Sequence, residues 1–138
     1  MNSHASIPTL GQVITQVRTF TQQDFNTFAE LSHDDNPIHV DAEFAATTRF
    51  GRTVAHGMFL YGVLCGVLSA NFPSARQLEQ ELVFPKPTYA GDEMTVRLEV
   101  LEIWPASKPA RLSTTITRPD GENSCEGHMF IRWTEETR

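Results

Sequence analysis

The run VAHGMFLYGVLCGVLSA, residues 54–70, is the segment around which the rest of this chain must be built. It is apolar on nearly every side and uncharged, which is typical either of a helix inside a protein core or of a membrane span. Its 17 residues reach only the lower limit for crossing a bilayer. This short length, together with three glycines, His56 and Ser69, favours a buried helix over a membrane span. Glycine recurs every four or five residues, which predicts close approach of a sheet or a ligand at Gly57, Gly62 and Gly66.

The residues before this run predict a strand followed by a helix. Valine, isoleucine and threonine alternate roughly with polar residues over 11–20, which is typical of a strand. Thr21 and Asp24 form a capping-box-like start, and an amphipathic helix is expected to run from there to about Ser32. The apolar residues of this helix at helical spacing are Phe25, Phe28, Ala29 and Leu31.

A proline separates this helix from the next one. Pro37 prevents a helix from running through 33–38, so we expect that polar segment to be irregular. A second short helix is expected over 41–48, with Phe44 and Ala45 directed inward.

After residue 73 the spacing of apolar residues changes to two, which predicts four consecutive antiparallel strands. Apolar and polar residues alternate over 78–84, 94–103, 110–116 and 125–133. In the second of these segments the alternation shifts after Val100, which predicts a bulge. The sequence Arg118-Pro119-Asp120-Gly121 predicts a hairpin turn. Because an apolar helix needs cover on every side, we expect one α+β domain over 1–138, with a strongly curved sheet wrapped around the helix.

Composition excludes several classes of protein. With 40% apolar and 20% charged residues, the chain has the profile of an ordinary globular protein. A net charge of -6 and the lack of a basic run argue against a nucleic-acid partner. The N-terminus lacks the pattern of a secretory signal, and no membrane association is expected. Cys65 and Cys125 have no metal-type spacing, which favours a reducing, cytoplasmic location.

The polar run Asp34-Asp35-Asn36-Pro37-Ile38-His39 is the first candidate site. A carboxylate and an imidazole held by a stiff proline segment suit general acid–base chemistry. An ordinary polar loop, with Asp34 as a cap and His39 exposed, explains the same residues, and the residues alone leave both interpretations open. A metal site is a weaker alternative, because Pro37 interrupts the spacing of its potential ligands His33, Asp34, Asp35 and His39.

The second candidate site is the start of the apolar helix, at His56-Gly57. The first N–H groups of a helix lack internal partners and lie at its positive end, so the Gly57 N–H can bind a developing oxyanion. Gly57 as a simple packing residue is the open alternative, and His56 alone is better interpreted as a structural histidine. A nucleophile is not indicated, because no G-x-S-x-G occurs and Cys65 lies within the apolar run.

Taken together, these segments resemble the (R)-specific enoyl-CoA hydratase branch of the MaoC-like hot-dog dehydratases. The likeness extends from about Phe20 to Trp133, and the D-x-N-P-x-H run followed by H-G-M is its most specific part. Other matching segments are Val40–Ala45, Phe50-Gly51-Arg52, Phe84-Pro85-Lys86-Pro87, Gly91-Asp92 and Lys108-Pro109-Ala110. The resemblance implies a hot-dog fold, in which a curved antiparallel sheet wraps a long helix, and a homodimer paired edge to edge with the acyl tunnel at its interface.

The resemblance also implies an activity and a set of site residues. It predicts reversible hydration of a trans-2-enoyl-CoA, or of an acyl-carrier thioester, to the (R)-3-hydroxyacyl form, without a metal or organic cofactor. The implied catalytic residues are Asp34, His39 and Gly57, and the expected substrate-binding residues are Asn36, His56, Met58, Phe59 and Tyr61. His33 stands where a small glycine is common. The alternatives are an acyl-thioester hydrolase on the same fold and a non-catalytic acyl-CoA-binding or partner subunit.

Overall fold

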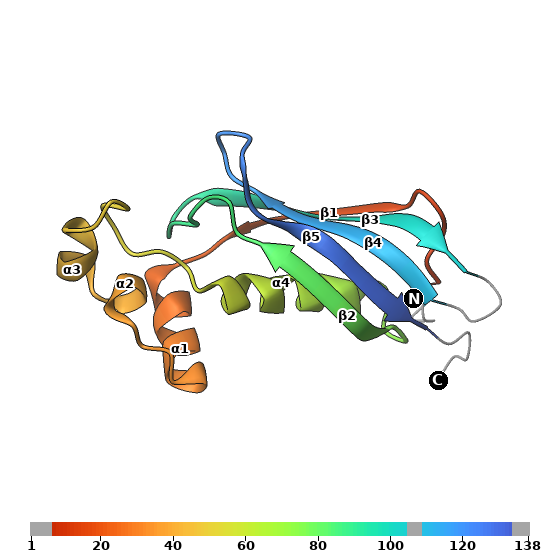
Figure 1. Ribbon diagram of the computed structural model, residues 1–138, viewed down its shortest axis with the longest axis horizontal. Helices are drawn as coiled ribbons and strands as arrows, with labels where there is room; N and C mark the ends of the chain where they lie inside the picture. Colours follow the sequence, from red (N-terminus) through yellow and green to blue (C-terminus); the bar gives the residue numbers. More distant parts are fainter. Residues whose placement is uncertain (1–6, 105–108, 134–138) are drawn as a thin grey trace.

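A computed structural model describes residues 7–104 and 109–133 (Figure 1). Lys108, which belongs to one of the matching motifs, lies outside the described residues. The helices are α1 (Gln22–Ser32), α2 (Pro37–Val40), α3 (Ala42–Ala46) and α4 (Gly57–Asn71). The strands are β1 (Val13–Thr19), β2 (Arg76–Val83), β3 (Glu93–Ile103), β4 (Pro109–Thr117) and β5 (Asn123–Arg132). Helix α4 lies along one face of the sheet, whereas α1, α2 and α3 gather beyond one end of it (Figure 1).

The five strands form one antiparallel sheet in the order β1-β3-β4-β5-β2. Strands β3, β4 and β5 pair in sequence order, as predicted. Strand β2 also comes next to β3 in the sequence, but it pairs with β5 at the opposite edge. Because β1 already occupies the free edge of β3, the free edge of β5 is the place left for β2. The α+β hot-dog architecture expected from the resemblance is confirmed.

The core lies between α4 and the sheet. The α4 side chains that are buried there are Leu60, Val63, Leu64, Val67 and Leu68. Alternate residues of β3 are buried from Met94 to Val100, which is the period-two pattern that the sequence predicted. The register of β3 against β4 then shifts between Val100 and Glu102, which confirms the predicted bulge. Burial of each large apolar side chain contributes about 1.5–3 kcal/mol.

Two local sequence patterns are also confirmed. The Thr21 side chain accepts a hydrogen bond from the Asp24 N–H, and the Asp24 carboxylate accepts one from the Thr21 N–H. This capping box begins α1. At the β4–β5 turn the Arg118 N–H donates to the Glu122 carbonyl over 2.8 Å, and Gly121 has a φ of 88°. A left-handed φ of this kind favours glycine.

The prediction that α4 is covered on every side is wrong for this single chain. The sheet covers only one side of the helix, and Met58 on the other side is 60% exposed. Gly62 and Gly66 also lie on the exposed side, and a Cβ added to either would meet no atom within 4 Å. Of the three glycines of α4, Gly57 alone has a close neighbour, which is the side chain of Phe84.

Several apolar side chains differ from the sequence prediction in being exposed. Leu31 at the end of α1 is 77% exposed and Phe44 on α3 is 44% exposed, since no strand lies over them. Leu78 is 49% exposed because the register of β2 against β5 shifts between Gln77 and Glu79, which leaves Leu78 as the extra residue of a bulge.

The segment after Pro37 is more regular than expected. It forms one turn of helix, α2, because a proline at the first helical position lacks an N–H that would have no partner there anyway.

Within the two described ranges, none of the helices combines the length and the hydropathy that crossing a membrane requires.

Candidate active site

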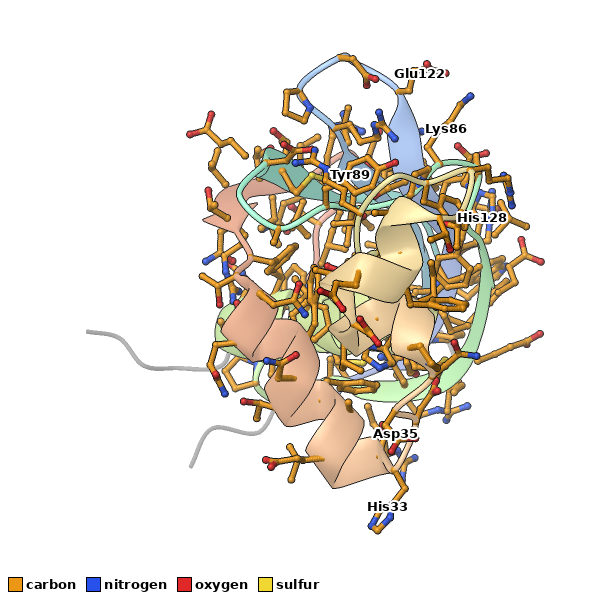
Figure 2. The ribbon with its side chains drawn as sticks, turned by 90° about the vertical axis from the view of Figure 1, so that its left-hand side faces the viewer. His33, Asp35, Lys86, Tyr89, Glu122 and His128 are labelled. Atoms are coloured by element: carbon orange, nitrogen blue, oxygen red, sulfur yellow. The ribbon has the colours of Figure 1, made fainter. Side chains whose placement is uncertain are left out.

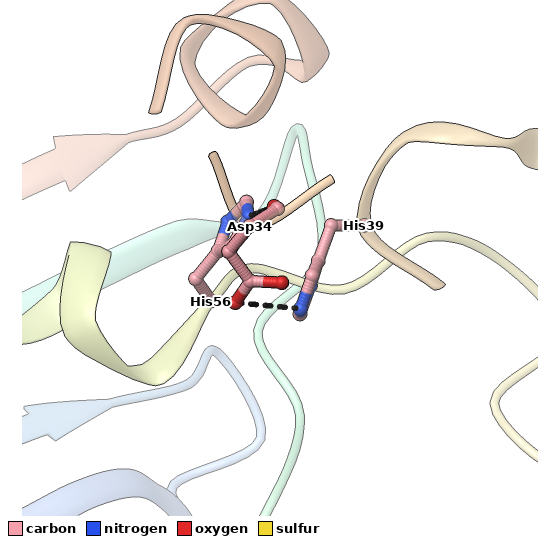
Figure 3. A group of neighbouring side chains, drawn as sticks. All are labelled: Asp34, His39 and His56. Carbon is pink, nitrogen blue, oxygen red and sulfur yellow. Dashed lines mark hydrogen bonds and ion pairs between the residues drawn. The ribbon is translucent and has the colours of Figure 1, made fainter. Parts of the chain in front are cut away.

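The polar run is held by a sharp turn and a cap. Helix α1 ends at Ser32, and its C-cap residue His33 has a left-handed φ of 65°. The next residue, Asp34, donates its N–H to the Ser32 hydroxyl over 3.1 Å. The Asn36 side chain then accepts a hydrogen bond from the Ile38 N–H over 3.1 Å and so caps α2. This local structure places His39 on α2, facing back toward Asp34 (Figure 3).

The two ring nitrogens of His39 have different roles. Nδ1 lies 2.8 Å from the Val54 carbonyl oxygen. Because a carbonyl only accepts hydrogen bonds, Nδ1 carries the proton and Nε2 of the neutral ring is an acceptor. Nε2 lies 4.0 Å from Oδ2 of Asp34 (Figure 3). The His39 side chain is 14% exposed and the Asp34 side chain 55% exposed, so the pair opens to solvent on the aspartate side.

His56 lies behind His39. Only 2% of His56 is exposed, and its ring stacks on that of His39 with a centroid distance of 3.7 Å and an interplanar angle of 21°. Its Nε2–H donates to the Asp34 carbonyl over 2.8 Å. Burial lowers the pKa of His56 below its usual 6.5, and the nearby His39 lowers it further, although the hydrogen bond to the Asp34 carbonyl acts in the opposite direction. His56 is therefore a neutral support that connects the Asp34 loop to the start of α4.

The start of α4 is the third part of the site. The first helical residue is Gly57, and the side chain of the preceding His56 makes no capping hydrogen bond. The N–H groups of Gly57 and Met58 have no hydrogen-bond acceptor within 7–104 and 109–133. These donors lie at the positive end of a 15-residue helix and are available to an anionic oxygen.

The Asp34–His39 spacing suits a bound water. A water that donates both hydrogens over about 2.8 Å each spans two acceptors that are about 4–4.5 Å apart. Oδ2 of Asp34 and Nε2 of His39, at 4.0 Å, are two such acceptors. A water held in this way directs its lone pairs outward, as a nucleophile would require.

The same residues are a poorer site for a metal ion. Asp34, His39 and His56 each offer a ligand atom, and these atoms lie within 4.8 Å of one another. A metal ion binds in the plane of an imidazole ring. The stacked rings of His39 and His56 are nearly parallel, so their planes do not meet at a point close to both. His33 and Asp35, the other two ligands considered from the sequence, are not part of this group.

The profile of the MaoC like domain matches residues 7–117, which is most of the chain. The chain belongs to the MaoC-like dehydratase family. The resemblance inferred from the sequence is thereby confirmed, and the protein is a hydro-lyase of the enoyl-CoA hydratase and 3-hydroxyacyl-thioester dehydratase kind.

Individual relatives of this MaoC-like protein have related activities in their names. It is 34% identical over 125 residues to an (R)-specific enoyl-CoA hydratase from Aeromonas caviae, covering 89% of this chain and 93% of the relative. It is 33% identical to a mitochondrial 3-hydroxyacyl-[acyl-carrier-protein] dehydratase from Solanum lycopersicum, covering 86% of this chain and 73% of that protein. The solved structure of an R-hydratase from Pseudomonas aeruginosa superimposes with a TM-score of 0.88 at 32% identity, covering 95% of this chain and 85% of that one.

The other residues predicted for the site lie in different parts of the structure. Met58 and Tyr61 line a cavity of about 460 Å³ between α4 and β2. Phe59 instead points into the core, where its ring packs edge-on against Phe20, Phe25 and Phe28. Asn36 is exposed and is used as the cap of α2.

Two residues of the polar run lie away from the pair of Asp34 and His39. His33 projects from the end of α1, and Asp35 lies beside it (Figure 2). Both line a separate depression on the α1 side of the MaoC-like domain, together with Glu30 and Val40. The two neighbouring aspartates of the run therefore face different surroundings.

Two residues that contact the candidate site were not singled out from the sequence as site residues. Gln22 on α1 donates through Nε2 to the His39 carbonyl over 2.9 Å and also binds Thr53, so it ties α1 to the α2 segment. Phe84, directly after β2, lies against Gly57. Helical spacing places Gln22 on the first turn of α1 but does not indicate its partner, and Phe84 was recognised only as part of a matching motif.

Proposed function

We propose that this protein hydrates a trans-2-enoyl thioester to the (R)-3-hydroxyacyl thioester and catalyses the reverse dehydration. The observation that carries this proposal is the Asp34–His39 pair, with its two acceptors 4.0 Å apart, together with the N–H groups at the start of α4 that have no acceptor among the described residues. The names of the Aeromonas caviae and Solanum lycopersicum relatives support a substrate carried either by CoA or by an acyl carrier protein.

In the proposed reaction Asp34 and His39 handle the water and its proton, and the start of α4 binds the carbonyl oxygen. Asp34 and His39 hold the water, and its oxygen bonds to C3 of the substrate while one O–H proton passes to the pair. The electrons of the C2–C3 double bond move toward the thioester carbonyl, and the Gly57 N–H binds the resulting enolate oxygen. The proton then passes from the pair to C2 on the same face, which completes the addition of water. His56 and Asn36 support these groups from behind and do not take part in the chemistry.

The first experiment measures hydration of crotonyl-CoA as loss of absorbance of the conjugated thioester, with chiral analysis of the product. Asp34→Asn and His39→Ala should each lower kcat by about 10²–10⁴, because each removes one general acid–base group. The matched control is Asp35→Asn, which changes the adjacent carboxylate in the separate depression and should keep nearly the wild-type rate. Wild-type rates in both Asp34→Asn and His39→Ala, in folded protein, would contradict the proposal.

The same assay separates the two alternatives. A thioester hydrolase would release free CoA thiol, which a disulfide reagent detects, whereas hydration leaves the thioester intact. A non-catalytic subunit would bind acyl-CoA without changing it. Either result in the wild-type protein would replace hydration as its function.

We also infer that the protein acts as a homodimer that pairs along the β2 edge. Edge strands expose unpaired backbone groups, and large exposed apolar patches mark interaction sites. Met58, Leu78 and Phe84 are 60%, 49% and 45% exposed, and all three line the cavity between α4 and β2. Pairing at this edge would cover that cavity and close the acyl tunnel. A cytoplasmic location is part of the same proposal, and the two free cysteines are compatible with it.

A further inference from the structure

Two cavities meet at the start of α4, with one aromatic ring between them. The cavity between α4 and β2, which we call the α4–β2 cavity, measures about 460 Å³ and is lined by Met58, Tyr61, Gln77, Leu78, Glu79, Gln80, Leu82 and Phe84. The second, which we call the Arg49 cavity, measures about 270 Å³, and its walls include Arg49, Gly57, Lys86 and Thr88. Phe84 is the residue that these two cavities share.

The Phe84 ring lies directly on Gly57. A Cβ added to Gly57 would be 2.8 Å from Cζ of Phe84 and 3.0 and 3.1 Å from the two Cε atoms, so the edge of the ring fills the space that a side chain would need. Phe84 comes immediately after β2, and Pro85 follows it, which restricts its backbone to extended conformations. The ring is thus positioned by its backbone and by the glycine, although 45% of the residue is exposed.

The two cavities differ in charge. Arg49 and Lys86 line the Arg49 cavity, and none of the described residues that line it is acidic. Lys86 has an ion-pair partner outside the cavity, Glu122, at 3.8 Å (Figure 2), but both side chains are half exposed and such a pair is weak. Among the described residues, the α4–β2 cavity is lined by no basic residue and by one acidic residue, Glu79. A carrier arm that ends in phosphate groups suits the first cavity, and an uncharged acyl group suits the second.

The inference drawn from these cavities rests on the proposed function and concerns the choice of substrate. If the Gly57 N–H binds the thioester carbonyl, the acyl group and the carrier arm leave that point in different directions, one into each cavity. Phe84 then stands at the point where they separate, against the carbons next to the carbonyl. We propose that Phe84 is a specificity-determining residue, whose ring selects enoyl thioesters that are unbranched at C2.

A substituent at C2 would have to occupy space that the ring of Phe84 fills. Rejection of one additional methyl group by a packed site typically changes kcat/KM by about 10–200-fold. Shortening Phe84 would join the two cavities beside Gly57 and make room for a methyl group at C2. Loss of the ring should therefore relax selection at C2 without removing Asp34, His39 or the Gly57 N–H.

The test compares kcat/KM for crotonyl-CoA with that for its 2-methyl derivative, tigloyl-CoA, in the same variants. Because each variant is measured with both thioesters, their different intrinsic reactivities cancel when the ratios are compared between variants. Phe84→Ala should lower the preference for crotonyl-CoA by about tenfold or more, and Phe84→Leu should lower it by less. The matched control is Val83→Ala, an adjacent exposed apolar residue that lines neither cavity, and it should keep the wild-type ratio.

The outcomes separate this inference from the function on which it rests. A wild-type protein that hydrates neither thioester would overturn both the proposed function and the role of Phe84. A wild-type protein that hydrates crotonyl-CoA, with the ratio unchanged in active Phe84→Leu protein and in Phe84→Ala if it folds, would overturn only the role of Phe84. An equal shift of the ratio in Val83→Ala would also overturn it, because the effect would then not depend on the ring at Gly57.

Discussion

At the scale of single residues, His33 has a backbone conformation that suits glycine. Its φ of 65° is left-handed, and it is the one non-glycine residue with positive φ in the described ranges. Left-handed backbone costs a residue with a Cβ about 1–2 kcal/mol, whereas glycine adopts it readily at the end of a helix. The turn matters because Asp34 follows it directly.

His33→Gly should therefore raise the free energy of unfolding by about 0.5–1 kcal/mol, as the relief of strain is partly offset by the greater freedom of glycine in the unfolded chain. Urea denaturation monitored by circular dichroism measures the change. His33→Ala is the control, since alanine keeps the Cβ and should bring no such gain. If alanine stabilised the protein as much as glycine, the strain would not be the cause.

At the scale of secondary-structure elements, His56 joins the loop after α1 to the start of α4. Its ring is buried, stacks on His39 and donates a hydrogen bond to the Asp34 carbonyl. The Nδ1 atom of the same ring is buried without a partner among the described residues, so the arrangement is stable with a neutral ring. This contact fixes the distance between the loop that carries Asp34 and the start of α4, on which the proposed reaction depends.

The lowered pKa of His56 predicts how stability depends on pH. Between the folded-state pKa and the unfolded value of 6.5, the unfolded chain binds more protons, so the free energy of unfolding falls as the pH is lowered through that window. Above 6.5 the stabilisation is fully present. His56→Gln keeps a donor but does not titrate. Its free energy of unfolding, measured by urea denaturation, should therefore fall less than that of the wild type when the pH is lowered from 7.5. A comparison at pH 8, above the window in which His56 titrates, corrects for lost packing, and equal falls in the two proteins would contradict the prediction.

At the scale of the whole molecule, the two edges of the sheet differ in what lies beside them. The β2 edge borders the cavity that contains Met58 and Tyr61, whereas the β1 edge is not part of it. The exposed face of α4, with Gly62 and Gly66, lies open in the single chain. A second copy at the β2 edge would supply the cover that the apolar helix was expected to need.

Leu78→Lys should therefore weaken the proposed dimer, because it places a charge in the exposed bulge of β2. Sedimentation velocity should show a dimer for the wild type and a shift toward monomer for this variant, with lower hydratase activity. Val17→Lys is the matched control, as Val17 is 54% exposed on the opposite edge strand, β1, and should leave the dimer intact. A monomeric wild type, or dissociation caused only by Val17→Lys, would contradict pairing at the β2 edge.

Features that depend on near neighbours in the chain were predictable from the amino-acid order. The capping box at Thr21, the bulge after Val100 and the turn at Gly121 follow from short-range hydrogen bonding and alternation. The buried helix follows from the uncharged run at 54–70, although it begins at Gly57 and not at Val54. The run from Asp34 to His39, followed by His56-Gly57-Met58, indicated the family and an expected active site, whereas the first run alone was also compatible with an ordinary polar loop.

Contacts between distant segments required the folded chain, because periodicity carries no information about which remote surfaces meet. The strand order that sends β2 to the far edge, the exposure of Phe44 beyond the sheet, and the position of Phe59 in the core are of this kind. So are the stacking of His56 on His39 and the ring of Phe84 on Gly57. The order of residues therefore determined the chemical groups of the candidate site, and the tertiary packing decided which of them lie together.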